Sequence, residues 1–473
     1  MRLLIGYWRC LLTTVLAFAP TAALAAGAEM AQLAPVWSVP FVGVLLSIAL
    51  FPVLAPVAWH HHFGKITAAW ALAFMLPFTA LFGPMAMGEN FTHALLAEYV
   101  PFILLLTALF TVSGGIFIRG NLHGSPGVNT AILAIGAVLA SFMGTTGASM
   151  LLIRPLIRAN DNRKHKAHVV VFFIFIVSNA GGSLTPLGDP PLFLGFLKGV
   201  DFFWTLKNIL PETLFLLSGL LAVFYAIDWK IYHDREEVLP VDPTPDTRQI
   251  GFDGARNFLL LGVIVALVLM SGFWKSAIAF NIWGTEVSLP GVLRDCGLIA
   301  VILLSLRITP ATVHADNRFS WAPMVEVAIL FAGIFITIVP VIVMLKTGVN
   351  GPFGMVVKLV TNPDGTPNPA MYFWITGLLS SFLDNAPTYL VFFNMAGGDP
   401  ALLMTTYAPT LAAISAGAVF MGANTYIGNA PNLMVKSIAE DRGVAMPSFF
   451  GYMAWSGAVL LPMFAIITLI WFI

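Results

Sequence analysis

Long apolar stretches recur along this chain at the length that spans a lipid bilayer. A helix needs about 20 apolar residues to cross the hydrocarbon core, and such stretches lie near residues 39–58, 66–85, 95–118, 208–229, 256–274, 295–308, 321–345 and 448–473. The composition agrees, because 58% of the 473 residues are hydrophobic and only 10% are charged. A soluble domain is rarely so apolar. The sequence therefore predicts an all-α polytopic membrane protein.

The first residues have the pattern of a signal peptide. Arg2 and Arg9 precede an apolar run that ends near Phe18, and small residues follow up to Ala26. This order of basic, apolar and small residues is typical of secretory signals. We therefore expect residues 1–25 to be removed and the mature chain to begin outside the cell. The alternative is an uncleaved first membrane helix, because the apolar run is nearly long enough to span.

Basic residues orient the predicted helices. Lys and Arg are enriched in cytoplasmic loops, and the most basic stretch, residues 154–166, is therefore placed in the cytoplasm. The segment 129–157 must then enter and leave on the cytoplasmic side, as a re-entrant hairpin with a flexible tip at residues 144–147. The polar stretch 230–256 also falls inside, as a linker loop between an N-terminal half, 26–229, and a C-terminal half, 257–473.

The two halves share an internal repeat. Residues 141–146 (SFMGTT) align with 381–386 (SFLDNA) at an offset of 240 residues, and the same offset aligns 182–191 with 422–431. By the charge pattern the first hairpin enters from the cytoplasm and the second from outside. We therefore predict two inverted repeats with re-entrant hairpins and discontinuous helices, in about 11 membrane-spanning elements plus two hairpins.

Paired helix breaks of this kind indicate a transport site. Gly, Pro and polar residues unwind the backbone, and the freed carbonyls and half-helix ends can bind ions where they line a cavity. In secondary transporters such breaks occur at corresponding positions of two inverted repeats, close to the bilayer midplane. The sequence therefore favours a secondary active transporter.

Three acidic residues inside apolar segments are candidates for exchanging protons or cations. An Asp at the centre of a membrane helix costs about 3 kcal/mol on insertion scales, so an acid there suggests a function. Asp189 and Asp384 each lie at a predicted helix break, where the alternative is a helix cap. Glu326 lies inside a predicted span, where the alternative is a cytoplasmic interface position. Three further acids lie nearer to segment ends, where we expect interfacial positions: Glu98, Glu212 and Asp228.

Side chains with oxygen atoms cluster around the same breaks. Hydroxyl and amide oxygens are the ligands that a hard cation such as sodium prefers. In the first half these candidate metal ligands are Thr145, Thr146, Ser149, Ser178, Asn179, Ser183 and Thr185, and in the second half they are Asn385, Thr388, Asn424, Thr425 and Asn429. Each alone is weak evidence, because Ser and Thr in membrane helices often bond a backbone carbonyl one turn earlier.

Other classes of protein fit the sequence less well. The Cys10 and Cys296 thiols are too far apart in the sequence to suggest a disulfide framework or a zinc site. Neither His-Glu-x-x-His nor Gly-x-Ser-x-Gly occurs, so we expect no catalytic residues and no enzyme activity. Equal numbers of basic and acidic residues, 23 each, do not suggest a nucleic-acid partner. A purely structural scaffold would not need paired breaks with buried acids.

Two blocks of this chain, 178–191 (SNAGGSLTPLGDPP) and 381–387 (SFLDNAP), resemble the ion transporter superfamily. Within it the chain is most similar to NhaD-type sodium/proton antiporters and to related citrate-transporter-like permeases, from about residue 39 onward. The resemblance implies a multi-pass protein of the bacterial inner membrane. It also implies a homodimer with a scaffold and a mobile transport domain that moves as an elevator, and two cation sites at the hairpin tips and broken helices.

One departure from the superfamily bears on the substrate. Sodium-coupled dicarboxylate members carry a Ser-Asn-Thr motif at both tips, whereas here the tips have the sequences Gly144-Thr145-Thr146 and Asp384-Asn385-Ala386. We therefore expect exchange of Na⁺ (or Li⁺) for H⁺, with sodium as the transported or coupling ion and no other cofactor. The alternative is a symporter that carries citrate or another organic anion with Na⁺ or H⁺, binding its carboxylates at half-helix N-termini.

Overall fold

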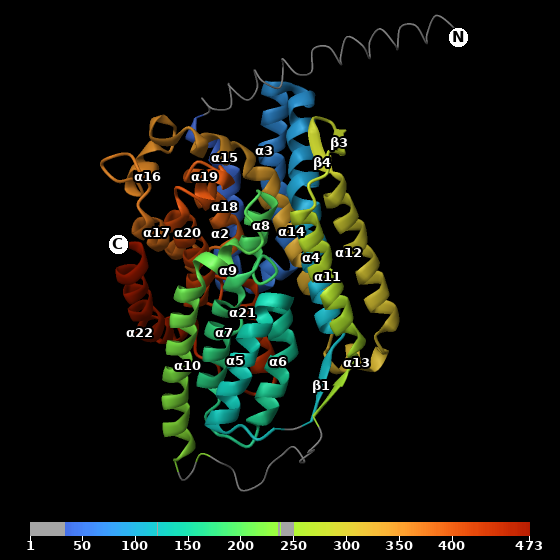
Figure 1. The fold of residues 1–473 in the computed structure, drawn as a ribbon, viewed down its shortest axis with the longest axis vertical. Helices are drawn as coiled ribbons and strands as arrows, with labels where there is room; N and C mark the ends of the chain where they lie inside the picture. The colour runs from blue at the N-terminus through green and yellow to red at the C-terminus, as the bar shows by residue number, and fades with distance from the viewer. Residues whose placement is uncertain (1–33, 121, 235–236, 238–249) are drawn as a thin grey trace, which may run out of the picture.

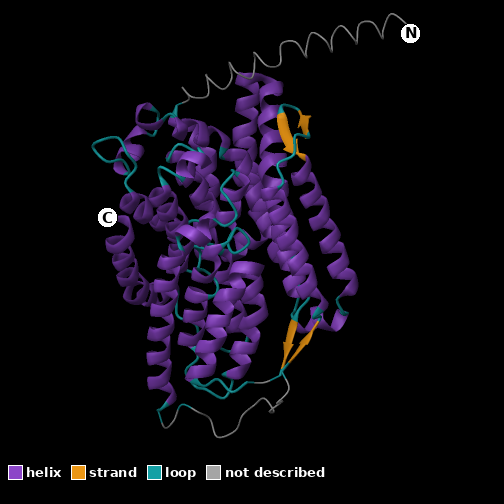
Figure 2. Cartoon of the chain, viewed as in Figure 1, coloured by secondary structure: helices purple, strands orange, loops and turns teal. Residues whose placement is uncertain are grey.

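The computed structural model describes residues 34–120, 122–234, 237 and 250–473 of the chain. The described residues fold almost entirely into helices, and their strands form two small two-stranded sheets (Figure 2). The predicted all-α polytopic membrane protein is thereby confirmed. The predicted signal peptide, residues 1–25, lies outside the described residues.

One group of helices forms an elongated bundle, which we call the flanking bundle. Figure 1 shows α4, α11 and α12 of this bundle along the right side of the molecule. Its helices are α2 (Val39–Leu54), α3 (Pro56–His93), α4 (Val100–Gly114), α11 (Arg256–Phe273), α12 (Leu289–Ile308), α13 (Ala311–Asp316) and α14 (Ala322–Thr337), with a π-helical turn at Ala94–Tyr99. The strands at its ends are β1 (Phe117–Arg119), β2 (Gly251–Asp253), β3 (Ala279–Ile282) and β4 (Thr285–Ser288).

The remaining helices pack into a second group, which we call the hairpin body. It contains α5 (Pro126–Met143), α6 (Thr145–Ala159), α7 (Ala167–Ile176), α8 (Pro190–Leu197), α9 (Trp204–Asn208), α10 (Leu210–Tyr232), α17 (Pro369–Phe382), α18 (Asn385–Met395), α19 (Pro400–Met404), α20 (Ala408–Met421), α21 (Ala430–Asp441) and α22 (Phe449–Ile467). Two helices, α15 (Val339–Lys346) and α16 (Gly354–Leu359), connect the bundle to the body. The remaining short helical turns are at Pro35–Ser38, Ala180–Leu184, Gly348–Asn350, Gly422–Asn424 and Thr468–Phe472.

The described helices include eight that are long and apolar enough to cross a membrane, or nine if the bent pair α14 and α15 counts as one span. One of the eight stretches runs through Pro56–Gly114, 59 residues, which is about 88 Å of helix against a hydrocarbon core of about 30 Å. It is bent at Gly83, whose φ of 87° and ψ of 162° suit only glycine. This stretch is therefore long enough for two crossings.

Two helical hairpins face each other from opposite ends of the molecule. Figure 1 shows α5 and α6 in the lower half and α17 and α18 in the upper half. The first turn is made at Gly144, whose φ of 81° ends α5 and begins α6; a side chain there would be strained. The second turn is made at Leu383 and Asp384. Both tips line one cavity, and the inverted orientation of the two repeats in the membrane stays a prediction.

The two helix breaks repeat the same local contacts at the 240-residue offset. The Thr185 hydroxyl donates to the Ser141 carbonyl, and the Thr425 hydroxyl donates to the Ser381 carbonyl. Each threonine oxygen also accepts an amide two residues later, at 3.2 Å in both halves. These bonds tie each broken helix to its hairpin and satisfy polar groups that lipid could not.

The linker between the halves is more ordered at its ends than the sequence suggested. We predicted a loop over 230–256, but α10 continues to Tyr232 and β2 pairs antiparallel with β1. An ion pair of 2.7 Å between Arg119 and Asp253 closes this small sheet. A helix and a strand therefore extend into the two ends of the predicted loop, and the linker between two halves stays a prediction.

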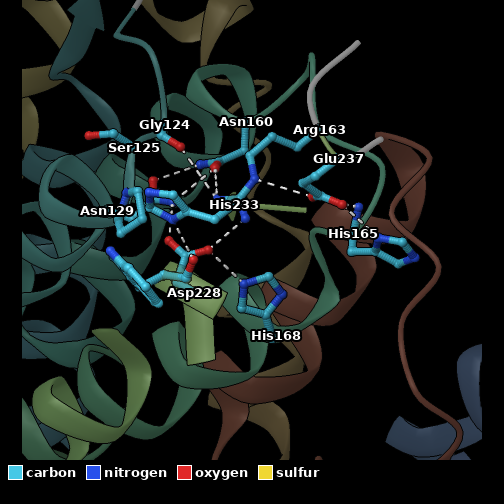
Figure 3. A network of polar contacts seen from close by, with 12 residues as sticks. Gly124, Ser125, Asn129, Asn160, Arg163, His165, His168, Asp228, His233 and Glu237 are labelled. Carbon is cyan, nitrogen blue, oxygen red and sulfur yellow. Dashed lines mark hydrogen bonds and ion pairs between the residues drawn. The ribbon is translucent and has the colours of Figure 1, made fainter. Parts of the chain in front are cut away.

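A buried ion-pair network anchors the base of the first hairpin (Figure 3). The Arg163 guanidinium lies 2.7 Å from Asp228 on α10 and 3.3 Å from Glu237. Asp228 also accepts hydrogen bonds from His168 on α7 at 2.8 Å and Asn129 on α5 at 2.9 Å. The Asp228 side chain is fully buried among these helices, and its predicted position at the membrane interface stays a prediction.

Asp228→Asn should destabilise the fold because it leaves the buried Arg163 charge undercompensated. Breaking a buried pair costs about 3–5 kcal/mol, whereas a surface pair contributes about 0–1 kcal/mol. We expect the thermal unfolding midpoint of the purified protein to fall clearly for Asp228→Asn and hardly at all for Asp253→Asn, whose partner Arg119 is exposed. Equal midpoints for the two variants would contradict this assignment.

Candidate functional site

Asp189 lies at the centre of the polar residues that the sequence pointed to. It precedes the first residue of α8, where Pro190 and Pro191 start the helix after the break. Proline suits this position because its missing N–H would have no helical partner. The Asp189 side chain does not cap α8, and its residue is only 1% exposed. Its carboxylate is therefore free to bind groups from other elements.

The Asp189 carboxylate receives hydrogen bonds from both hairpins and from the second break. Thr145 at the first tip donates to one oxygen at 2.9 Å, and the Asn429 amide approaches the same oxygen at 3.3 Å. The Asn385 amide at the second tip donates to the other oxygen. Three of the predicted ligand residues, taken from both halves of the chain, thus surround one predicted exchanging acid.

A chain of buried amides continues from Asp189 across the two breaks. Asn429 Nδ2 lies 3.2 Å from the Asn179 side-chain oxygen, and Asn179 Nδ2 donates to Asn432 at 2.8 Å. Asn432 in turn donates to the carbonyls of Gly422 and Thr425, both at 2.9 Å. Asn432 was not predicted from the sequence. The sequence feature that could have pointed to it is its position about one helical turn after Asn429, which precedes the first residue of α21.

Several of the other predicted ligand residues make one of two kinds of contact. Ser149 and Ser178 pair with each other at 2.8 Å, and Ser183 pairs with Thr213 at the same distance. Thr185 and Thr425 bond the hairpin backbones, as described above, while Thr388 bonds the Asp384 carbonyl and Asn424 donates to Ser381. These residues stabilise the breaks and do not contact Asp189.

Two buried amide oxygens lack a hydrogen-bond partner within the described part of the chain: Asn385 Oδ1 and Asn424 Oδ1. An unsatisfied buried acceptor is uncommon in a folded protein. Asn385 also donates to Asp189, so its free oxygen belongs to a residue that already contacts the acid. An amide oxygen of this kind is a suitable ligand for a hard cation.

A cavity of about 100 Å³ lies beside Asp189, and a larger chamber of about 420 Å³ adjoins it. Thr145, Thr146 and Asp384 line the first, and Asp384 also lines the second, together with Glu326. Asp384 accepts the Ala386 amide at 3.0 Å and thus caps α18. Glu326 accepts the Trp59 indole N–H at 3.1 Å. Asp189 and Asp384 therefore line the same cavity, whereas Glu326 faces the adjoining chamber.

The lining of both spaces is acidic and apolar, and neither contains a Lys or Arg. Groups of three or more His, Cys, Asp and Glu residues that could hold a metal ion do not occur in the described residues. Any cation held in the Asp189 cavity would therefore have the carboxylates of Asp189 and Asp384 and neutral oxygens as its possible ligands. Such a set suits a weakly bound monovalent ion better than a tightly held transition metal.

Comparison with known proteins assigns the family. A family model described as "Putative citrate transport" matches residues 30–472, nearly the whole chain. The chain belongs to this citrate-transport family. Its relatives include two proteins named as uncharacterized transporters, from Mycobacterium bovis and Mycobacterium tuberculosis. Each is 25% identical over 371 residues, which are 76% of this chain and 79% of the relative. A third, from Synechocystis sp., is 23% identical over 382 residues, 76% of this chain and 78% of the relative.

Membership of this family confirms part of what the sequence predicted. This member is a multi-pass membrane protein of a transporter family, and its resemblance to citrate-transporter-like permeases is confirmed. The resemblance to NhaD-type antiporters stays a prediction, and so do the transported ion and the site residues.

Asn432→Ala should weaken the junction between the two breaks. The substitution removes both donors to the Gly422 and Thr425 carbonyls and the acceptor for Asn179. Each buried group left unsatisfied costs about 1–3 kcal/mol, so the unfolding midpoint should fall measurably. The matched control is Asn90→Ala, whose amide makes one local bond to Ala86. An equal effect of both changes would argue against a bridging role for Asn432.

Proposed function

We propose that this protein is a secondary active transporter that exchanges Na⁺ (or Li⁺) for H⁺ across the bacterial inner membrane. The observation that carries the proposal is the buried Asp189 carboxylate, which accepts hydrogen bonds from Thr145, Asn385 and Asn429 but forms no ion pair with a described basic residue. A buried carboxylate without a countercharge is costly. Either a proton or a sodium ion can neutralise the carboxylate. Exchange requires that the two compete for the same group in this way.

Asp384 and Glu326 serve this exchange as acids along the path. Asp384 lines both spaces, and Glu326 faces the larger one, from α14 of the flanking bundle. Movement of the hairpin body against the flanking bundle would carry Asp189 and Asp384 past the stationary Glu326. Such an elevator motion within a homodimer is part of the proposal, and the division of the chain into two packed groups supports it.

A second candidate is symport of citrate or another organic anion with Na⁺ or H⁺. The observation that favours it is the match to the citrate-transport family. The lining of the cavities speaks against it, because an anion with several carboxylates would face Asp189, Asp384 and Glu326 without a basic side chain. Backbone amides at the break before α8 are the remaining groups that could bind a carboxylate.

The test is proton movement driven by a sodium gradient in proteoliposomes. Asp189→Asn keeps the shape but cannot exchange a proton, so we expect exchange to fall by at least a hundredfold. Asp384→Asn should lower it by at least tenfold. The control is Asp316→Asn, an exposed acid at the end of α13, which should leave exchange unchanged.

Two results would contradict the proposal. One is that the wild-type protein moves no protons under a sodium gradient at any pH between about 6 and 9, the range around neutral pH in which a buried carboxylate can titrate. The other is full exchange in both Asn variants. Sodium-dependent uptake of labelled citrate in the same vesicles would instead favour the symport candidate.

A further inference from the structure

Four arginines gather where α6 and α21 both end. Arg154 and Arg158 lie one helical turn apart on α6, and Arg442 follows the last residue of α21, which packs against α6. Arg318 comes from the flanking bundle, two residues after α13. The cluster therefore combines groups from both the hairpin body and the flanking bundle, at the end of the molecule that the basic residues place in the cytoplasm.

Three of these guanidinium groups form no ion pair with a carboxylate among the residues that the structure describes. Arg154 Nη1 is buried and has no hydrogen-bond partner within the described residues. The positive charges of Arg442 and Arg318 are close enough to act on Arg154. Within the described part of the chain, no ion pair joins Arg154, Arg318 or Arg442 to a carboxylate. Like charges repel, and a buried N–H without an acceptor is costly.

The backbone at Arg318 adopts a strained conformation. Its φ is 47°, a left-handed conformation that is uncommon for residues other than glycine. The next residue, Phe319, packs on Phe110 of α4 with ring centroids 5.2 Å apart. The strained turn therefore holds Arg318 at the junction between the bundle and α6.

Favourable interactions of arginines with the negative end of a helix dipole do not account for the whole cluster. Arg158 lies in the last turn of α6, donates to the Ile118 carbonyl at 2.9 Å and covers the Phe117 ring, so its contacts are complete. Arg154 lies five residues before the end of α6. The helix dipole acts mainly within the last turn, so it does not explain the unpartnered Arg154 Nη1.

An apolar layer separates this cluster from the Asp189 cavity. Met150, one turn before Arg154, packs with Phe110 and Met324 into a small buried cluster. Phe110 and Met324 also line the Asp189 cavity. The arginines therefore lie on the cytoplasmic side of this layer, and an anion held there would not contact the acids around Asp189.

We propose that Arg154, Arg318 and Arg442 form a binding site for a multivalent oxyanion, a carboxylate or phosphate group with two or more negative charges. Guanidinium groups bind such oxygens in pairs and keep their charge at any physiological pH. The anion comes either from solution, as a polycarboxylate, or from the headgroup of an acidic phospholipid. It would join the hairpin body to the flanking bundle on the cytoplasmic side, and the proposal does not depend on the ion that Asp189 exchanges.

The test measures binding by the full-length protein in lipid nanodiscs. In phosphatidylcholine discs, citrate is titrated at constant ionic strength and its affinity is measured by calorimetry. In parallel, the unfolding midpoint is compared between phosphatidylcholine discs and discs that contain cardiolipin. Both measurements are repeated for Arg154→Gln and for Arg442→Gln; the exposed position of Arg442 keeps the second variant informative if the first does not fold. Arg307→Gln, an exposed arginine at the end of α12, is the matched control.

Two results support the site, and they separate its sources. A dissolved anion is indicated if citrate binds at least tenfold more weakly to both variants than to wild type and Arg307→Gln. A headgroup is indicated if citrate does not bind but cardiolipin raises the midpoint of wild type and not of the variants. The proposal is overturned if neither probe has an effect or if the effects persist in both variants. It is also overturned if Asp189→Asn abolishes citrate binding, because citrate would then occupy the other cavity.

Discussion

Polar groups released at a helix break inside a membrane protein must find all their partners within the protein, and this constraint organises the structure. Lipid offers no hydrogen bonds, so each unwound segment needs donors and acceptors from a neighbouring element. Thr185 and Thr425 meet part of this need by binding the hairpin backbones, and Asn432 binds two carbonyls of the second break. The hairpins are thus required by the breaks that they cover.

The same constraint joins the two halves of the chain into one body. Asp189 of the first half accepts Asn385 and Asn429 of the second half, and Asn179 bonds Asn432. These buried bonds would all have to break if the halves separated. The contact between the hairpin body and the flanking bundle has another character, because it includes an apolar layer around Met150, Phe110 and Met324. Separating the body from the bundle would therefore break fewer buried polar bonds than separating the two halves.

One partly buried ion pair crosses from body to bundle. Lys198 at the end of α8 pairs with Glu98 in the π-helical turn, and the Glu98 residue is only 6% exposed. We had expected an interfacial position for Glu98 and for Glu212, but both side chains are buried. A segment-end position indicates depth along the membrane normal and says little about lateral burial by neighbouring helices. The burial of these acids is therefore compatible with the interfacial positions, which stay predictions.

The sequence by itself determined the fold class, the 240-residue repeat, and the acids and amides at the breaks. Apolar length, charge placement and polar residues inside apolar segments are local signals of membrane topology. The tertiary structure alone decided which candidates meet: Asp189 with Asn385 and Asn429, but Glu326 in a separate chamber and Ser183 against Thr213. It also revealed Asn432 and the convergence of Arg154, Arg318 and Arg442. Contacts between residues far apart in the sequence depend on how the helices pack laterally, which no local pattern in a single sequence encodes.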